Sequence, residues 1–217
     1  MYNLILFDLD GTLTDSKVGI VICVKYALES FGITENDEET LLKFIGPPLY
    51  DSFRDIYGFS HNDAVLAVDK YRKRFGNIGI FENSVYPDTK DALKLLKNNG
   101  KRLALATSKP LVYAERILKH FEIDNLFDYA VGANADGSRG YKEEVIEETL
   151  RQASPYVCQE TVIIGDREND ILGAKKCGIS SIGLRRGYAA KNELENAGAD
   201  FIFNDLMEAS LFIINSK

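Results

Sequence analysis

The sequence predicts an α/β protein in which an all-helical domain is inserted into a parallel sheet. From residue 86 onward, apolar strands alternate with amphipathic helices, a pattern typical of a parallel sheet covered on both faces. The apolar run from Leu4 to Phe7 has the pattern of a strand buried on both faces. Between these two parts, residues 15–83 show helical patterns and no convincing strand.

These observations predict two domains. Residues 1–14 and 84–217 form the expected α/β core domain, and residues 15–83 form the expected helical cap domain. The first strand has no partner near it, so we place it in the later sheet, as the central strand. The insertion then lies over the carboxyl end of that sheet, and the two crossings near residues 14–15 and 83–86 are the expected hinges.

The elements follow from apolar spacing and from start and stop residues. In the cap, Val18, Val21, Val24, Leu28 and Phe31 recur at helical spacing before Gly32. A short helix near residues 40–44, a rigid turn at 46–48 and two helices follow, the last one capped by Ser60 and Gly76. The remaining core strands are expected at residues 101–107, 128–131, 161–164, 179–184 and 200–203, with helices starting near 87, 110, 142 and 166 and a final helix over 206–214.

Composition excludes several classes of protein. A net charge of −7 argues against a nucleic-acid partner, because binding a phosphate backbone needs a basic face. No apolar run approaches the roughly 18 residues that span a bilayer, so no membrane partner is expected. The N-terminus lacks a signal-peptide pattern, and three widely spaced cysteines suggest reduced, mostly buried thiols, so we expect a cytoplasmic protein. The two histidines make a His-based zinc site improbable, and nothing indicates the oligomeric state.

Polar side chains follow several of the predicted strands. They are Asp8 and Asp10, Thr107 and Ser108, Lys142, and Asp166 and Asp170. The carboxyl ends of parallel strands lie at one edge of a sheet, where ligands bind, so these groups should meet there. Mg²⁺ prefers oxygen ligands such as carboxylates, and the hydroxyls and the ammonium suit phosphoryl oxygens. The sequence therefore predicts a site for Mg²⁺ and a phosphorylated small molecule.

The residue types in this set suggest phosphoryl transfer. A carboxylate beside a metal ion and a phosphoryl group is a competent nucleophile, and a second carboxylate two residues away can protonate the leaving group. Each residue taken alone also has a structural interpretation. Asp166 or Thr107 could cap a helix, and Lys142 could simply follow a loop. Their joint occurrence at strand ends favours chemistry, whereas we expect Lys109 and Arg167 to be surface or supporting groups.

The motifs resemble those of the haloacid dehalogenase superfamily. Asp8-Leu9-Asp10-Gly11-Thr12, Thr107-Ser108, Lys142 and the segment from Gly165 to Asp170 look like its four motifs, in the same order. Within it, residues 45–49, 107–110 and 136–142 look like those of phosphoglycolate phosphatases. The resemblance implies a Rossmann-like core with a helical cap of the C1 type, and it covers essentially the whole chain.

The resemblance also implies a role for each residue. Asp8 would be the nucleophile and a Mg²⁺ ligand. Asp10 would be the general acid and then the base, with its backbone carbonyl on the metal. Thr107 and Ser108 would bind phosphoryl oxygens, Lys142 would neutralise charge, Asp166 would bind the metal directly, and Asp170 would bind it directly or through water. In the cap, Lys43 is the expected substrate contact, with Arg72 and Arg74 as other candidates.

The predicted function is therefore Mg²⁺-dependent hydrolysis of a small phosphomonoester through an aspartyl-phosphate, by an enzyme that resembles phosphoglycolate phosphatase. Three alternatives stay open. The substrate could be a nucleotide, as in a 5'-nucleotidase, or a sugar phosphate. The enzyme could also be a mutase that resembles β-phosphoglucomutase. A non-catalytic protein that senses phosphorylation is the third, although Asp10 would make its phosphoaspartate short-lived.

Overall fold

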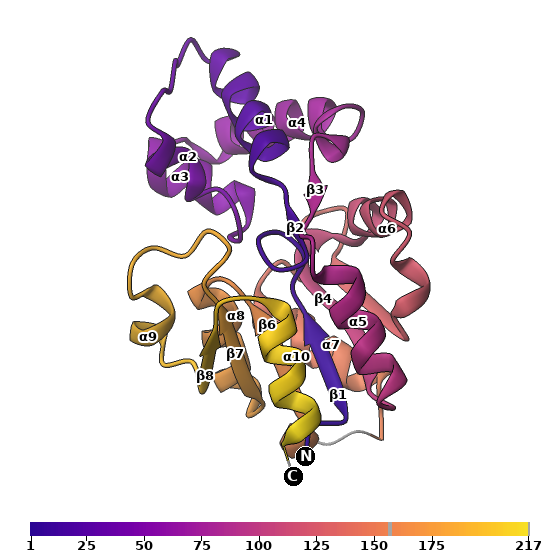
Figure 1. The fold of residues 1–217 in the computed structure, drawn as a ribbon. Coiled ribbons are helices and arrows are strands. Elements are labelled where there is room, and N and C mark those ends of the chain that lie inside the picture. The colour runs from indigo at the N-terminus through magenta and orange to yellow at the C-terminus, as the bar shows by residue number, and fades with distance from the viewer. Residues whose placement is uncertain (156–157, 217) are drawn as a thin grey trace.

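A six-stranded parallel sheet forms the centre of the larger lobe (Figure 1). The computed structural model describes residues 1–155 and 158–216. The sheet has the order β5-β4-β1-β6-β7-β8, which confirms the α/β fold class and the central place of the first strand. Its strands are β1 (Leu4–Phe7), β4 (Arg102–Pro110), β5 (Tyr129–Ala133), β6 (Thr161–Gly165), β7 (Ser180–Leu184) and β8 (Phe201–Phe203).

Strand β1 is buried on both faces, which explains why its sequence shows no alternation of polar and apolar residues. Leu4 and Leu6 belong to one apolar cluster, and Ile5 and Phe7 belong to another on the opposite face of the sheet. All four side chains are fully buried, and each such burial is worth about 2 kcal/mol. The end of this strand is thus held rigidly, and so is the start of the loop that follows it.

Helices cover both faces of the sheet, as Figure 1 shows. Helices α7 and α8 pack on one face, whereas α5, α6 and α10 pack on the other. Their bounds are α5 (Thr89–Asn98), α6 (Leu111–His120), α7 (Lys142–Gln152), α8 (Glu168–Cys177) and α10 (Leu206–Asn215). The short helix α9 (Glu193–Ala197) was not predicted, and β4 runs three residues further than expected.

The smaller lobe is the predicted helical insertion, above the carboxyl ends of the strands in Figure 1. It contains α1 (Lys17–Glu29), α2 (Glu38–Leu42), α3 (Leu49–Tyr57), α4 (His61–Phe75) and the 3₁₀ turn η1 (Gly79–Phe81). The Ser60 hydroxyl caps α4 by accepting a hydrogen bond from the Asp63 N–H at 3.2 Å. The apolar face predicted for α1 was partly wrong, since Val18 is 57% exposed. Its buried face instead carries Ile20, Cys23, Val24, Ala27 and Leu28, the spacing that best faces α4.

A two-stranded antiparallel ribbon joins the lobes at the predicted crossings. Strands β2 (Thr14–Asp15) and β3 (Ser84–Val85) are too short to be recognised from sequence. The Tyr86 N–H donates to the Leu13 carbonyl at 3.2 Å, which fastens the ribbon to the core. This ribbon supports our proposal that the domains divide near residues 14–15 and 83–84.

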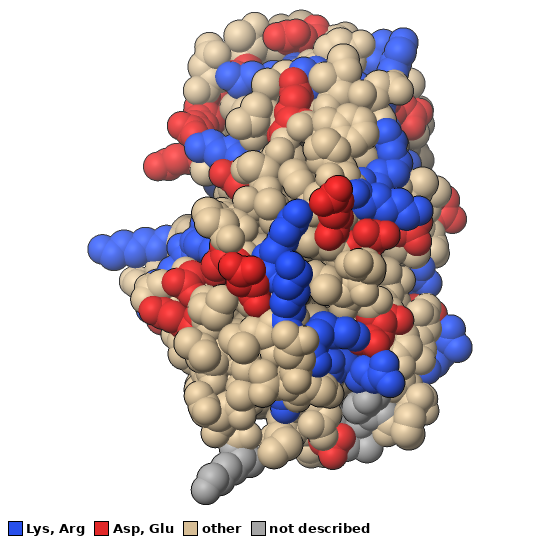
Figure 2. All heavy atoms as spheres, turned by 45° about the vertical axis from the view of Figure 1, so that its right-hand side comes forward, with Lys and Arg blue, Asp and Glu red and all other residues tan. Residues whose placement is uncertain are grey.

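The surface of the described residues mixes charges of both signs (Figure 2), and the cysteines are not paired. Among the described residues, no helix combines the length and the apolar character required to cross a membrane. Acidic and basic side chains are interspersed over the face seen in Figure 2. The three cysteines are free thiols, as expected, but only Cys23 is fully buried, whereas Cys158 and Cys177 are half-buried.

Candidate active site

Asp8 lies directly beyond the central strand, at the carboxyl edge of the sheet. Its backbone N–H donates to the Ile164 carbonyl of β6 at 2.9 Å, so the ladder of the sheet continues to the residue itself. Its side chain is buried and accepts a hydrogen bond from the Lys142 ammonium, with Oδ1 at 2.6 Å from Nζ. The position predicted for a nucleophile is therefore fixed from both the backbone and the side chain.

The turn after Asp8 brings Asp10 back toward the site. The N–H groups of Leu13 and Thr14 both donate to the Leu9 carbonyl, at 2.9 and 3.0 Å, which closes a tight loop. Gly11 has a φ of +86°, and a Cβ there would lie 2.2 Å from the Asp166 Oδ2 atom. Glycine is thus required twice, for the backbone angle and for the space. The loop holds Asp10 over the same edge of the sheet as Asp8.

The buried ammonium of Lys142 lies among three oxygen atoms. As the first residue of α7, Lys142 extends its ammonium to Asp8 Oδ1 at 2.6 Å, Asp170 Oδ1 at 2.8 Å and the Ala106 carbonyl at 3.1 Å. The contacts with Asp8 and with the Ala106 carbonyl are hydrogen bonds, and the contact with Asp170 is an ion pair. Burial opposes the charge of Lys142, but the carboxylates of Asp170 and Asp8 outweigh it and raise the pKa above its usual value. The surroundings therefore favour the charged form of Lys142.

Asp166 and Asp170 complete the acidic cluster from the end of β6 and the first turn of α8. Asp166 Oδ1 accepts from the Thr12 hydroxyl at 3.1 Å, and Oδ2 accepts from the Tyr188 N–H at 2.7 Å. Asp170 Oδ2 accepts from the Arg167 N–H at 3.1 Å. Burial and the nearby carboxylates of Asp170 and Asp8 raise the pKa of Asp166 well above its usual value. A buried carboxyl group in that environment is stabilised as an anion only when a cation is present.

The cluster fits a hard divalent cation. Asp8, Asp166 and Asp170 each offer a carboxylate oxygen, and these atoms lie within 4.8 Å of one another. With all three carboxyl groups ionised, the single ammonium of Lys142 would leave an excess of two negative charges in a buried place. An all-oxygen donor set with that charge suits Mg²⁺ rather than a soft metal ion. The Asp10 side chain is not part of this trio and pairs with Lys109, and the predicted contact of the Asp10 backbone carbonyl with the metal stays a prediction.

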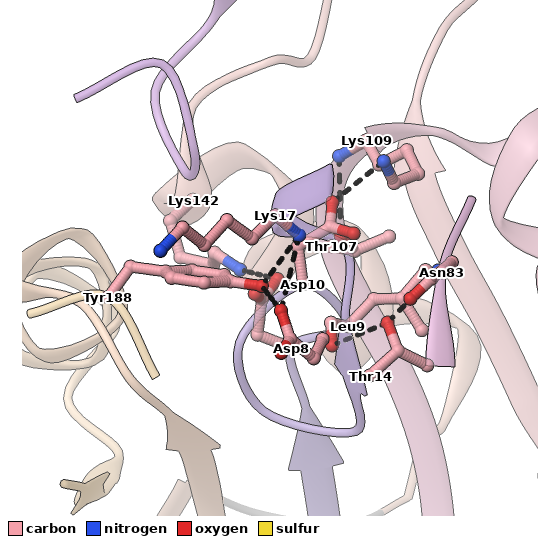
Figure 3. A network of polar contacts seen from close by, with 11 residues as sticks. Asp8, Leu9, Asp10, Thr14, Lys17, Asn83, Thr107, Lys109, Lys142 and Tyr188 are labelled. Atoms are coloured by element: carbon pink, nitrogen blue, oxygen red, sulfur yellow. Dashed lines mark hydrogen bonds and ion pairs between the residues drawn. The ribbon is translucent and has the colours of Figure 1, made fainter. Parts of the chain in front are cut away.

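A bulge in β4 presents Thr107, Ser108 and Lys109 to the site. The register of the β4–β5 pair shifts between Thr107 and Pro110, and the Lys109 N–H donates to the Thr107 hydroxyl oxygen at 3.3 Å. Such bulges reorient side chains next to functional sites. The Lys109 ammonium thereby reaches Asp10, with Nζ at 2.8 Å from Oδ2. Figure 3 shows Lys109 directed toward Asp10, with Thr107 close by.

A cavity of about 530 Å³ lies between the sheet edge and the cap. The core contributes Asp8, Asp10, Thr107, Ser108 and Lys109 to its wall. The cap lines the cavity mainly with apolar and aromatic side chains and with Arg72. Its lining includes Ile20, Phe44, Leu49, Tyr50, Val65, Val68, Tyr71 and Phe75.

The three cationic candidates of the cap have different surroundings. Lys43 is exposed and is not in the wall of the cavity, so its contact with substrate stays a prediction. Arg72 lines the cavity and donates to the Ala135 carbonyl of the core at 2.9 Å. Arg74 forms an ion pair with Glu82 at 2.7 Å, within the cap. The structure therefore brings Arg72 to the cavity, and neither Lys43 nor Arg74.

Sequence reasoning missed the groups that hold the predicted residues in place. Lys109, expected to be either a surface or a supporting group, is the latter, since its side chain is only 7% exposed and pairs with Asp10. The backbone N–H of Tyr188 and the hydroxyl of Thr12 orient Asp166, and Arg167 links the core to the Ile45 carbonyl of the cap. The role of a backbone N–H cannot be recognised from residue identity. For Lys109, its position directly after Thr107 and Ser108 was a signal in the sequence.

Comparison with known proteins agrees with this arrangement. The family model described as "Haloacid dehalogenase-like hydrolase" matches residues 5–184, a range that includes all the predicted site residues, from Asp8 to Asp170. The chain belongs to the haloacid dehalogenase-like hydrolases. The resemblance of its motifs to this superfamily is thereby confirmed, together with the fold that the resemblance implied.

Relatives of this haloacid dehalogenase-like hydrolase have several names. A 5'-nucleotidase of Pseudomonas aeruginosa is 42% identical over 193 residues, covering 89% of this chain and 87% of its own. Tyrosine-protein kinase PtkA of Mycobacterium tuberculosis is 36% identical over 92% of this chain and 68% of its own. A phosphoglycolate phosphatase of Colwellia psychrerythraea is 29% identical over 95% and 94%. The crystal structure of a predicted phosphatase from Clostridium acetobutylicum has a TM-score of 0.96 and 43% identity, and each chain is covered completely.

Proposed function

We propose that this hydrolase removes phosphate from a small phosphomonoester through an aspartyl-phosphate on Asp8. The single observation that carries the proposal is the Asp8 carboxylate, fixed at the sheet edge at 2.6 Å from the Lys142 ammonium and open to a cavity of about 530 Å³. A buried, oriented carboxylate beside a permanent cation is suited to attack a phosphoryl group whose charge that cation offsets.

In the first step, an oxygen of Asp8 attacks phosphorus while the bond to the leaving oxygen breaks. Because Lys142 holds Oδ1, we assign the attack to Oδ2. The Asp10 carboxyl gives its proton to the leaving oxygen, so that an alcohol departs. Asp10, then a carboxylate, takes a proton from water as the water oxygen attacks phosphorus. Inorganic phosphate leaves, Asp8 is regenerated, and the proton rests on Asp10 for the next cycle.

Asp8, Asp166 and Asp170 would hold Mg²⁺, with the Asp10 carbonyl as the fourth ligand that the family resemblance implies. When bound, the ion supplies positive charge to the phosphoryl oxygens and offsets the excess negative charge of the cluster. The Thr107 hydroxyl and the Ser108 N–H bind phosphoryl oxygens, and Lys142 neutralises the nucleophile and the group in transfer.

The cavity favours a substrate larger than phosphoglycolate. A volume of about 530 Å³ lies within the range that accommodates ligands of the size of a drug molecule, and a two-carbon acid would leave most of it empty. The cap side of the wall is rich in aromatic residues, including Phe44, Tyr71 and Phe75. Among the described residues of the cap, Arg72 is the one Lys or Arg in the wall, and the carboxylates of Asp51 and Asp69 of the cap and of Asp136 of the core accompany it. This surface suits an uncharged ring, such as that of a nucleoside, better than a carboxylate, so we rank nucleoside 5'-monophosphates first.

A phosphate-release screen tests the proposal. Nucleoside 5'-monophosphates, phosphoglycolate and sugar phosphates are supplied with Mg²⁺, and free phosphate is measured against substrate loss. Equal amounts of both indicate a hydrolase. Isomer formation would instead indicate a mutase, and transfer of phosphate to a protein tyrosine would indicate a kinase of the kind for which one relative is named. A phosphoenzyme that persists without turnover would support a sensing role.

We expect Asp8→Asn to abolish phosphate release, since an amide oxygen is a poor nucleophile, while the protein stays folded. The loss should exceed 10³-fold in kcat. The exposed Asp91, on α5, supplies the control: Asp91→Asn should retain full activity. Near-full activity of Asp8→Asn would show that Asp8 is not the nucleophile, and undiminished turnover after chelation of Mg²⁺ would show that the metal assignment is wrong.

A further inference from the structure

Lys109 lies between Asp10, the proposed acid/base residue, and the cap. Its ammonium lies 2.8 Å from Asp10 Oδ2, and both side chains are almost entirely buried, at 7% and 11% exposed. On its other side, the ammonium lies over the ring of Phe75, 4.4 Å from the centroid. Asp10 and Lys109 belong to the core, whereas Phe75 is the last residue of α4 in the cap.

The two oxygens of Asp10 differ sharply in their partners. Oδ2 is held by Lys109. Within the described part of the chain, Oδ1 is buried and has no hydrogen-bond partner. An unpaired buried oxygen is unfavourable, and a water molecule, an ion or a reacting group can supply its missing partner. Since Asp10 lines the cavity, Oδ1 is the oxygen available to the leaving group.

Phe75 makes the ion pair between Lys109 and Asp10 depend on the position of the cap. Its ring is stacked on Tyr71 of α4, at 5.3 Å, and meets Tyr113 of α6 edge-on at 5.5 Å, so the ring spans the boundary between cap and core. A buried ammonium is favoured by the face of an aromatic ring. If the cap moved away, Lys109 would lose this ring and gain water, and its hold on Asp10 would weaken.

We propose that Lys109 is a positioning residue for the Asp10 acid/base group, and that Phe75 couples this positioning to closure of the cap. Lys109 fixes Oδ2 and thereby aims Oδ1, the atom that carries the proton, at the leaving oxygen. Lys109 transfers no proton itself. This inference rests on the proposed function, because it assigns a partner to the residue that protonates the leaving group.

Leaving-group dependence tests the proposal. Departure of 4-nitrophenolate needs little protonation, whereas departure of the 5'-hydroxyl of a nucleoside needs a proton. The value of kcat/KM reports the steps up to release of the leaving group. We expect Lys109→Met to lower kcat/KM about 100-fold for a nucleoside 5'-monophosphate and only a few-fold for 4-nitrophenyl phosphate. Lys109→Arg, which keeps the charge, should recover most of the loss.

The ratio of the two kcat/KM values is measured on one preparation, so it does not depend on the fraction of protein that is folded. Phe75→Leu should shift this ratio in the same direction by about threefold, the size expected from loss of a cation–π contact. The exposed Lys94, on α5, gives the matched control, and Lys94→Met should leave the ratio unchanged. Asp10→Asn supplies the maximal shift for comparison.

Three results would overturn the inference. They are an equal loss for both substrates, a change confined to KM, and wild-type activity in Lys109→Met. The first would indicate a structural role, and the second a role in binding. If the wild-type protein released no phosphate from either compound, the proposed function itself would fail, and the two failures are therefore distinguishable.

Discussion

At the scale of single residues, the site depends on small groups that leave room for acidic ones. Gly187, in the loop after β7, is the clearest example, because a Cβ there would lie 2.0 Å from Asp166 Oδ2. The next residue, Tyr188, donates its backbone N–H to that same oxygen at 2.7 Å. The loop thus approaches the carboxylate as closely as a hydrogen bond permits, which only glycine allows at position 187.

Gly187→Ala should therefore displace Asp166 without unfolding the protein. Groups that orient metal ligands typically change metal affinity 10–100-fold, so we expect a weakening of Mg²⁺ binding of at least tenfold. Titration calorimetry with Mg²⁺ and the Mg²⁺ dependence of phosphate release measure the effect. In the control Gly100→Ala, the new methyl group meets nothing within 4 Å, so the φ of +74° should cost some stability while Mg²⁺ affinity does not change. An unchanged affinity in Gly187→Ala would contradict the assignment of Asp166 to the metal.

At the scale of elements, Asp128 joins the start of β4 to the end of α5. Its carboxylate accepts from Lys97 at 2.8 Å, from Arg102 at 2.6 Å and from the Leu103 N–H at 2.9 Å. Burial alone would raise the pKa of Asp128, but the hydrogen bonds from Lys97, the Leu103 N–H and Arg102 outweigh it and lower the pKa below its usual value. The folded state consequently favours the ionised form.

This lowered pKa gives a pH dependence with a definite sign. The stabilisation is complete above the unfolded-state pKa of about 4 and is lost as the pH falls through the lower pKa of the folded state. Asp128→Asn should lower the free energy of unfolding by about 1–2 kcal/mol at pH 7, a modest value because Lys97 and Arg102 are partly exposed. Urea unfolding at pH 7 and near pH 3 should show the difference between wild type and variant shrinking. A constant difference would show that the ion pairs are not its source.

The elements were largely predictable, and the reasons for the exceptions are physical. Strand β1 was predictable because a strand buried on both faces is an apolar run. Asp8 and Asp166 were predictable because ligands bind at strand ends, where acidic residues follow such runs. The ribbon of β2 and β3 was missed, since two-residue strands carry no periodicity. For Lys109 the sequence left a surface and a supporting role open, because the β-bulge that places it depends on pairing with β5, which residue identity does not reveal.

At the scale of the whole molecule, one loop connects the candidate metal site to the hinge. The Tyr188 hydroxyl donates to Asp15 Oδ1 at 2.7 Å and accepts from the Lys17 N–H at 3.0 Å, while its backbone N–H holds Asp166. Asp15 lies in β2, and Lys17 begins the first helix of the cap. Figure 3 shows the Tyr188 hydroxyl directed toward the backbone of Lys17. One residue, Tyr188, therefore contacts both the hinge that orients the cap and the acidic cluster.

Tyr188→Phe removes only the hydroxyl, so it should loosen the hinge and leave the contact with Asp166 intact. Hydrogen exchange followed by mass spectrometry should show faster exchange at residues 14–17 and 84–86, with no change in the strands of the sheet. Phosphate release should fall several-fold, because the cap would close less often. Unaltered exchange at the ribbon would show that other contacts hold the cap in place.

The placement of β1 at the centre of the sheet also determines when the site can assemble on a ribosome. Leu4 pairs with Arg102 on one side and with Thr161 on the other. Strand β1 is therefore synthesised first, but its two partner strands are synthesised much later. The contacts of the cap helices are mostly local and can form earlier, whereas distant pairing is slow because a long loop must close first. Until residues beyond 165 have left the exit tunnel, the apolar run before Asp8 lacks one neighbour, and a nascent chain with a finished cap still has no place for phosphate.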